Sequence, residues 1–172
     1  RLLDWTYSPL VALHFATGAI EHMHCDGAVW KVDYHQASRL LPPRLGSKLT
    51  ELSSNVFTTD LLSELVDNLD EFDLLSKSDF VMFLEPPSID DRIVNQFALF
   101  SIISNARVAL DSWLETHPEL YTKVVIPAAL KWEIRDKLDQ ANITERVLFP
   151  GLSGLSCWLR RHYSARGSEA RD

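Results

Sequence analysis

The chain has 172 residues, of which 46% are hydrophobic and 24% are charged, so it is long enough and apolar enough to bury a core as one globular domain. Its formal net charge of −7 argues against general nucleic-acid binding, which needs clustered Lys and Arg side chains. We find no apolar run long enough to span a membrane and no signal-peptide pattern. These features predict a cytoplasmic protein that does not bind membranes.

The two cysteines, Cys25 and Cys157, lie far apart and form no disulfide framework, so both are expected to be reduced thiols. His22 and His24 precede Cys25, but zinc sites usually need a second pair of ligands, and none follows. We therefore expect no metal site. A group of basic residues near the C-terminus is predicted to be solvated: Arg160, Arg161, His162, Arg166 and Arg171.

Turn residues and apolar periodicity divide the chain into alternating elements. Ser8 and Pro9 predict the start of a helix, whereas residues 36–55, with three Pro or Gly residues, are predicted to be mostly loop. The final helix should carry Leu152, Leu155 and Leu159 facing inward. Strands are expected at 27–33, 79–84, 96–103 and 121–126, and helices at 9–17, 59–69, 109–115, 127–140 and 151–162, with Leu130, Ile134 and Leu138 on the inner face of the fourth helix.

This mixture of strands and helices predicts an α+β fold in which these four strands form one central sheet, mostly antiparallel or mixed, with helices packed on it. The chain opens at Arg1 without an initiator Met and goes directly into apolar, patterned sequence. We therefore expect a segment of the same protein to precede Arg1 and to complete the sheet beside residues 4–6. The domain is predicted to span 1–163, and residues 164–172 to form a C-terminal tail.

Two segments combine residue types that are suited to a binding site. The first, residues 1–9, places Asp4, Trp5, Thr6 and Ser8 directly before an apolar helix. Asp4 could instead pair with Arg1 or cap backbone amides while Trp5 packs in the core. These polar groups therefore have either a functional or a structural role.

The second segment places Arg92 four residues before Gln96, so the two would share a face if the turn is helical. Gln96 heads an apolar strand, where a polar side chain needs a partner or a ligand. It could bind a ligand or could be bonded to a neighbouring loop. We expect Arg92 and Gln96 to converge with Asp4, Trp5 and Thr6 on one concave surface.

The chain resembles the FRG family, which is named for a Phe-Arg-Gly motif near its start. The resemblance is carried by RLLDWTYSPLVALHFA at 1–16, GAVWKVD at 27–33, RIVNQFALFSI at 92–102, VIPAALKWEIRDKL at 125–138 and VLFPGLSGLSCWLRR at 147–161. The Phe-Arg-Gly segment and the Gln- and His-rich stretch expected just before Arg1 are missing. Ala98 stands where the family usually has Gly, which has no Cβ and lets the backbone approach closely.

A more distant likeness connects the chain to ADP-ribosyltransferases. The order of Thr6, Tyr7 and Ser8, then a helix, then a strand, is similar to their Ser-Thr-Ser segment, and Gln96 stands where those enzymes place a catalytic Glu. The likeness implies NAD as a substrate and no metal. In this interpretation the catalytic residues are Gln96, Asp4 and Thr6, and the cofactor-binding residues are Trp5, Ser8 and Arg92.

Cleavage of the nicotinamide–ribose bond passes through an oxocarbenium-like cation, which needs an aromatic slot, hydroxyl contacts and a facing negative charge. Because Gln96 is neutral, Asp4 or Glu85 would have to supply that charge. The target of modification stays open, and the resemblance is compatible with bacterial anti-phage or toxin systems. The alternative is a non-catalytic FRG module that binds a nucleotide or a protein partner. Metal-dependent nucleic-acid hydrolysis lacks the carboxylate cluster that it would need.

Overall fold

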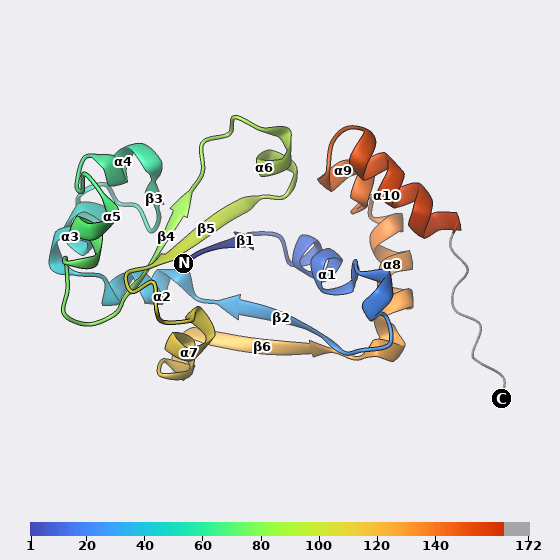
Figure 1. Cartoon of the computed structure of the whole chain (residues 1–172), viewed down its shortest axis with the longest axis horizontal. Coiled ribbons are helices and arrows are strands. Elements are labelled where there is room, and N and C mark those ends of the chain that lie inside the picture. The colour runs from blue at the N-terminus through green and yellow to red at the C-terminus, as the bar shows by residue number, and fades with distance from the viewer. Residues whose placement is uncertain (164–172) are drawn as a thin grey trace.

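The computed structural model describes residues 1–163, so the predicted tail at 164–172 lies outside the described residues. The predicted α+β fold is confirmed: helices pack on a four-stranded mixed sheet, and a separate two-stranded ribbon lies beside it (Figure 1). The sheet has the order β1-β5-β4-β3, and the ribbon pairs β2 with β6. The strands are β1 (Leu2–Thr6), β2 (Gly27–Val32), β3 (Phe57–Thr58), β4 (Val81–Glu85), β5 (Ala98–Ile103) and β6 (Tyr121–Ile126).

A central sheet of four strands is present as predicted, but the assignment of the strands at 27–33 and 121–126 to it was wrong. β5 pairs antiparallel with β1 on one side and with β4 on the other, so both of its edges are occupied. β2 and β6 instead pair with each other, with Gly27 opposite Ile126. Residues 2–6, which were not among the four predicted strands, form β1 in the main sheet. Consequently, in the described part of the chain, β1 is an edge strand of the main sheet and β2 has no strand on the side opposite β6.

Local sequence signals set most helix boundaries. Ser8 caps α1 (Pro9–Thr17) by accepting a hydrogen bond from the Val11 amide at 3.4 Å, as predicted. Residues 36–55, predicted as loop, contain α3 (Pro43–Glu51), because Pro43 is compatible with the first turn of a helix and Leu45 and Leu49 are buried. The remaining helices are α2 (Tyr34–Ala37), α4 (Thr59–Ser63), α5 (Leu69–Asp73), α6 (Asp91–Asn95), α7 (Leu110–Glu115), α8 (Ala128–Gln140), α9 (Glu145–Leu148) and α10 (Leu152–Tyr163), with short 3-10 turns at Ile20–His22, Ser38–Leu40 and Pro118–Leu120.

The hydrophobic core covers both faces of the main sheet, because side chains alternate along β4. Met82 and Leu84 pack with the side chains of α3 and α5, whereas Val81 and Phe83 pack with Trp113 of α7. The single helix predicted near 59–69 is divided into α4 and α5, since Asn68 caps a new helix. Within the described residues, no helix is long and apolar enough to cross a membrane.

The predicted inner faces of the last two long helices need correction. In α10, Leu152 is 84% exposed and the other two leucines of the stripe are also exposed, whereas Arg161 is buried. In α8, Leu138 is buried as predicted, but Leu130 is exposed and Arg135 is buried in its place. These two helices face the rest of the protein with charged side chains, which apolar periodicity does not detect.

Candidate functional site

A cavity of about 950 Å³ lies between the main sheet and the β2–β6 ribbon. Residues of β1, α1, β2, α6, β5 and α7 line it, so it is formed by segments distributed from residue 3 to residue 114. Four aromatic side chains contribute to its wall: Trp5, Phe15, Trp30 and Phe100. The volume lies at the upper end of the range typical of small-molecule sites.

Asp4, Trp5, Thr6, Arg92 and Gln96 all line this cavity, although about ninety residues separate the two groups in sequence. The Thr6 hydroxyl donates a hydrogen bond to the Gln96 backbone carbonyl at 2.7 Å, which holds the groups together. Their roles in binding or chemistry stay predictions.

Ser8, by contrast, is not among the residues that line the cavity. Its side chain caps α1 instead. Thr6 also has a structural role, because its hydroxyl accepts a hydrogen bond from the Ser8 amide at 3.0 Å while donating to the carbonyl of Gln96. Both hydroxyls of the predicted pair are therefore already engaged in shaping the turn between β1 and α1.

Asp4 and Trp5 differ in how the protein uses them. The Trp5 indole nitrogen donates to the Ser101 hydroxyl at 2.8 Å, and its ring packs 5.9 Å from the ring of Phe83, which fixes the indole at the cavity wall. Asp4 is exposed and makes no ion pair within the described residues, since Arg1 pairs with Asp73. Asp4 is therefore a free carboxylate at the mouth of an aromatic-lined cavity.

Gln96 was predicted to be the first residue of a strand, but this prediction was wrong. It is instead the C-cap residue of α6. Phe97 follows in the left-handed region with φ of 50°, and β5 begins only at Ala98. The Gln96 side-chain nitrogen donates to the Leu148 carbonyl at 2.8 Å. Because a carbonyl can only accept, this bond fixes the orientation of the amide and leaves its oxygen available to a ligand.

Arg92 supplies the one positive charge of the cavity wall. Its guanidinium lies over the Phe149 ring, 5.2 Å from the ring centre, and forms no ion pair within the described residues. Three carboxylates also line the wall, namely Asp4, Asp90 and Asp111. The cavity is therefore mostly acidic and aromatic, with one cation near its α6 side.

Glu85, the alternative source of negative charge, does not line the cavity. It accepts a hydrogen bond from the Tyr7 hydroxyl at 2.8 Å. Burial and this carboxylate together raise the pKa of Tyr7 well above its usual range. No group of His, Cys, Asp and Glu suited to hold a metal ion occurs among residues 1–163, and both cysteines are exposed and unpaired.

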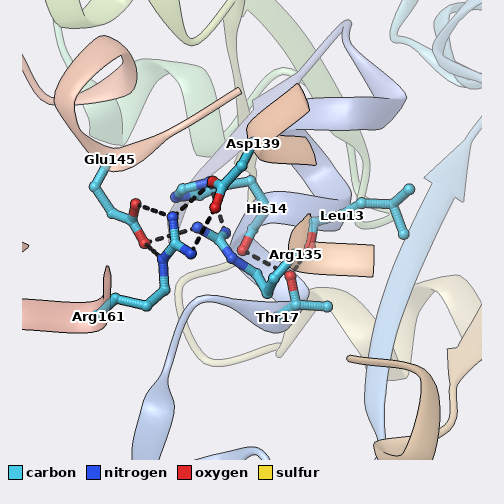
Figure 2. A network of polar contacts seen from close by, with 7 residues as sticks. All are labelled: Leu13, His14, Thr17, Arg135, Asp139, Glu145 and Arg161. Carbon is cyan, nitrogen blue, oxygen red and sulfur yellow. Dashed lines mark hydrogen bonds and ion pairs between the residues drawn. The ribbon is translucent and has the colours of Figure 1, made fainter. Parts of the chain in front are cut away.

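A buried network of charged side chains behind α1 was missed by sequence reasoning (Figure 2). Arg135 of α8 is fully buried and donates to His14 Nδ1 at 2.8 Å and to Glu145 at 2.7 Å. Arg161 of α10 donates to both oxygens of Glu145 and to both oxygens of Asp139, at 2.6 to 2.9 Å. The prediction that Arg161 belongs to a solvated basic tail was therefore wrong. Its side chain instead connects α10 with α8 and α9.

The network keeps His14 neutral. Burial lowers the pKa of His14 to about 4, and the positive charge of Arg135 acts in the same direction. Burial alone would raise the pKa of Glu145, but the hydrogen bond from Arg161, a backbone hydrogen bond and the positive charges of Arg135 and Arg161 together outweigh burial, so its pKa lies below the usual range. A sequence signal did exist: Arg135 and Asp139 lie four apart on the face of α8 that also carries Leu138.

The network also bears on the cavity through α9. Glu145 is the first residue of this one-turn helix, and Leu148, whose carbonyl holds Gln96, is the last. Asn95 donates to the neighbouring Val147 carbonyl at 3.0 Å. The position of the Gln96 amide is therefore connected, through one helical turn, to the buried charges.

The comparison with known families connects the start of the chain to one of them. The FRG domain matches residues 1–24, which include β1 and α1 and therefore the Asp4, Trp5 and Thr6 wall of the cavity. No curated protein and no solved structure shows significant similarity to the chain.

Proposed function

We propose that the chain binds NAD in the cavity and transfers ADP-ribose from it. The observation that supports this proposal is the meeting of a free carboxylate, a fixed indole, a fixed amide oxygen and a guanidinium in one cavity, contributed by Asp4, Trp5, Gln96 and Arg92. The FRG match covers the segment that contributes the first two of these groups.

Each group suits one part of NAD. The nicotinamide ring is cationic, so it favours an aromatic wall such as Trp5 with a carboxylate nearby. Arg92 can bind the diphosphate with paired N–H donors. The amide oxygen of Gln96 can accept a hydrogen bond from a ribose hydroxyl.

In the proposed reaction, the bond between the ribose C1′ and the nicotinamide nitrogen breaks, and the electron pair leaves with nicotinamide. An acceptor nucleophile then forms a new bond to C1′ and loses its proton to solvent. The positive charge that develops on the ribose faces Asp4, whose carboxylate would stabilise it. Among residues 1–163, Asp4 pairs with no cation, so its carboxylate is available for this purpose.

The proposal is tested by calorimetric titration with NAD and by measuring release of free nicotinamide. Arg92→Ala should weaken NAD binding about tenfold or more, because it removes charge-assisted hydrogen bonds to the diphosphate. Arg107→Ala is the matched control, since Arg107 is also exposed but does not line the cavity. If the wild-type chain binds no NAD, or if both variants lose affinity equally, the proposal is wrong.

A second candidate is a non-catalytic module that binds a nucleotide without cleaving it. Two observations favour it: Gln96 is neutral, and the Thr6 hydroxyl already serves the β1–α1 turn. Both candidates predict NAD binding that depends on Arg92. Only the enzyme releases nicotinamide, so binding without release would identify the module.

A further inference from the structure

The cavity is bordered by two strand edges that have no strand beside them among residues 1–163. Side chains alternate between the two faces of a strand, so consecutive lining residues mean that the edge of the strand faces the space. Four consecutive residues of β1 (3–6) and three of β2 (28–30) line the cavity. β1 and β2 are the facing outer strands of the two sheets (Figure 1).

The hydrogen-bond register of β1 shows which backbone groups are unused. The Tyr7 amide bonds to the Phe97 carbonyl and the Ile103 amide bonds to the Arg1 carbonyl, so the odd-numbered residues of β1 face β5. The N–H and C=O groups of Leu2, Asp4 and Thr6 consequently point away from β5. Within the described residues, no strand pairs with them.

β2 has the same arrangement on its side of the cavity. The Asp33 amide bonds to the Leu120 carbonyl, which continues the register of the β2–β6 pair. Odd-numbered residues of β2 therefore face β6, and the backbone groups of Ala28 and Trp30 point to the side that has no strand. Two rows of unpaired donors and acceptors thus border the same cavity, and such edges readily accept an added strand.

The charge of the cavity indicates the kind of strand that fits. Asp4, Asp90 and Asp111 outnumber Arg92 along the wall, and Asp4 has no ion-pair partner in the part of the chain that the structure describes, so a basic side chain is favoured. Apolar side chains of α1 and α7, such as Phe15 and Leu114, add an apolar surface for the other residues of the strand.

We propose that an extended segment of a separate protein, alternating apolar and basic residues, docks between β1 and β2 and joins the two sheets into one, in place of the segment of the same protein that the sequence led us to expect beside residues 4–6. The added strand would hydrogen-bond to Asp4 and Thr6 on one side and to Ala28 and Trp30 on the other. This proposal does not rest on NAD binding, because the strand uses backbone groups, and a failure of NAD to bind would leave it intact.

The test uses a fluorescent, end-capped peptide of alternating Val and Arg, measured by polarisation, together with hydrogen exchange of backbone amides by NMR. Binding should raise the protection of the Asp4, Thr6, Ala28 and Trp30 amides at least tenfold. A peptide with Glu in place of Arg, and one with N-methyl groups at alternate positions, should each bind at least tenfold more weakly.

Ala28→Pro removes the donor of one unpaired N–H and leaves the β6 bonds in place, since Pro is tolerated where its nitrogen faces away from the ladder. It should weaken peptide binding about tenfold. Val125→Pro is the matched control, because Val125 is the residue opposite Ala28 and its amide faces the far side of the ribbon. Equal losses in both variants would overturn the proposal.

Other occupants of the cavity would give different results, and each of these results would contradict the proposal that the strand comes from a separate protein. Concentration-dependent dimerisation that protects the same amides would identify a second copy of the chain. Protection of these amides in the natural protein without any added peptide would identify a strand of its own polypeptide. Absence of peptide binding, or protection on one edge only, would also overturn the proposal.

Discussion

The charged network behind α1 and the cavity between the sheets use polar residues in opposite ways. In the network, Glu145 receives bonds from two guanidinium groups, and Arg161 contacts both oxygens of Asp139. In the cavity, Asp4 pairs with no cation of residues 1–163, and the oxygen of Gln96 is left available. Polar groups that serve structure are bonded to each other, whereas those in the cavity are held in place but remain open to a ligand.

This contrast has an energetic basis. A charge that is buried without a partner is costly, so the network is stable only if every member keeps its partner. Exposed groups at the cavity have little folding energy to lose, because solvent already satisfies them. Variants of the network should therefore lower the free energy of unfolding, whereas variants of the cavity should change ligand binding with little effect on stability.

The largest effect is expected for Glu145→Ala. The change leaves Arg135 and Arg161 without their shared carboxylate, and breaking a buried pair costs about 3–5 kcal/mol of unfolding free energy. Urea denaturation of the purified protein measures this loss. Glu133→Ala removes an exposed pair with Lys137 and should leave the unfolding midpoint nearly unchanged. Similar midpoints for both variants would mean that the network is not structural.

The next effect is the pH dependence caused by His14. Its pKa is lowered from 6.5 to about 4, so below pH 6.5 the unfolded chain binds a proton that the folded protein does not. His14 therefore stabilises the fold fully above pH 6.5, and this contribution falls by about 1.4 kcal/mol per pH unit toward pH 4. Urea midpoints between pH 7 and pH 5 should show the slope. His14→Asn, which keeps an acceptor for Arg135, should flatten it, and an unchanged slope would contradict the assignment.

Gln96→Ala should affect both quantities, because Gln96 belongs to both regions. Losing the bond to the Leu148 carbonyl should cost about 1 kcal/mol of stability, and losing the amide oxygen should weaken NAD binding about tenfold. Asn95→Ala is the matched control, because it removes an equivalent hydrogen bond, to the Val147 carbonyl, at a side chain that does not line the cavity. If Asn95→Ala weakens NAD binding equally, Gln96 acts only through the fold.

The smallest effect on stability is expected for Asp4→Asn. Because Asp4 is exposed and forms no ion pair with any residue that the structure describes, the unfolding free energy should change by no more than about 0.5 kcal/mol. Nicotinamide release should nevertheless fall more than NAD binding does, since the carboxylate acts on the charge that develops in the reaction. A large loss of stability would show that Asp4 has a structural partner.

Sequence reasoning succeeded where the signals are local. Ser8 and Pro9 fix the start of α1 through capping, and the residue types within each of the two polar segments identified Asp4 and Gln96 as candidates, both of which line the cavity. It failed where the partner is distant. The leucines of α10 are exposed because Arg161 turns the opposite face of that helix toward Glu145.

The split of the strands into two sheets was also beyond sequence reasoning. β-Strand propensity identifies a strand but not its neighbour, and β1 competes with the other strands for the edge of β5. The engagement of the Thr6 hydroxyl could not be predicted either, since its acceptor is a backbone carbonyl ninety residues away. Local chemistry therefore predicts which residues are available, and tertiary pairing decides which of them are used.

The strand pairing has a consequence for the way the chain folds. β1 cannot pair until β5 has been synthesised, and β2 cannot pair until β6 has been synthesised, because each partner strand follows nearly a hundred residues later in the chain. Closing such long loops is slow, so folding on a timescale of milliseconds to seconds is expected. During synthesis both strands that border the cavity stay unpaired until residues 98–126 have left the ribosome. The two edges of the cavity therefore form only after about three quarters of the chain has been synthesised.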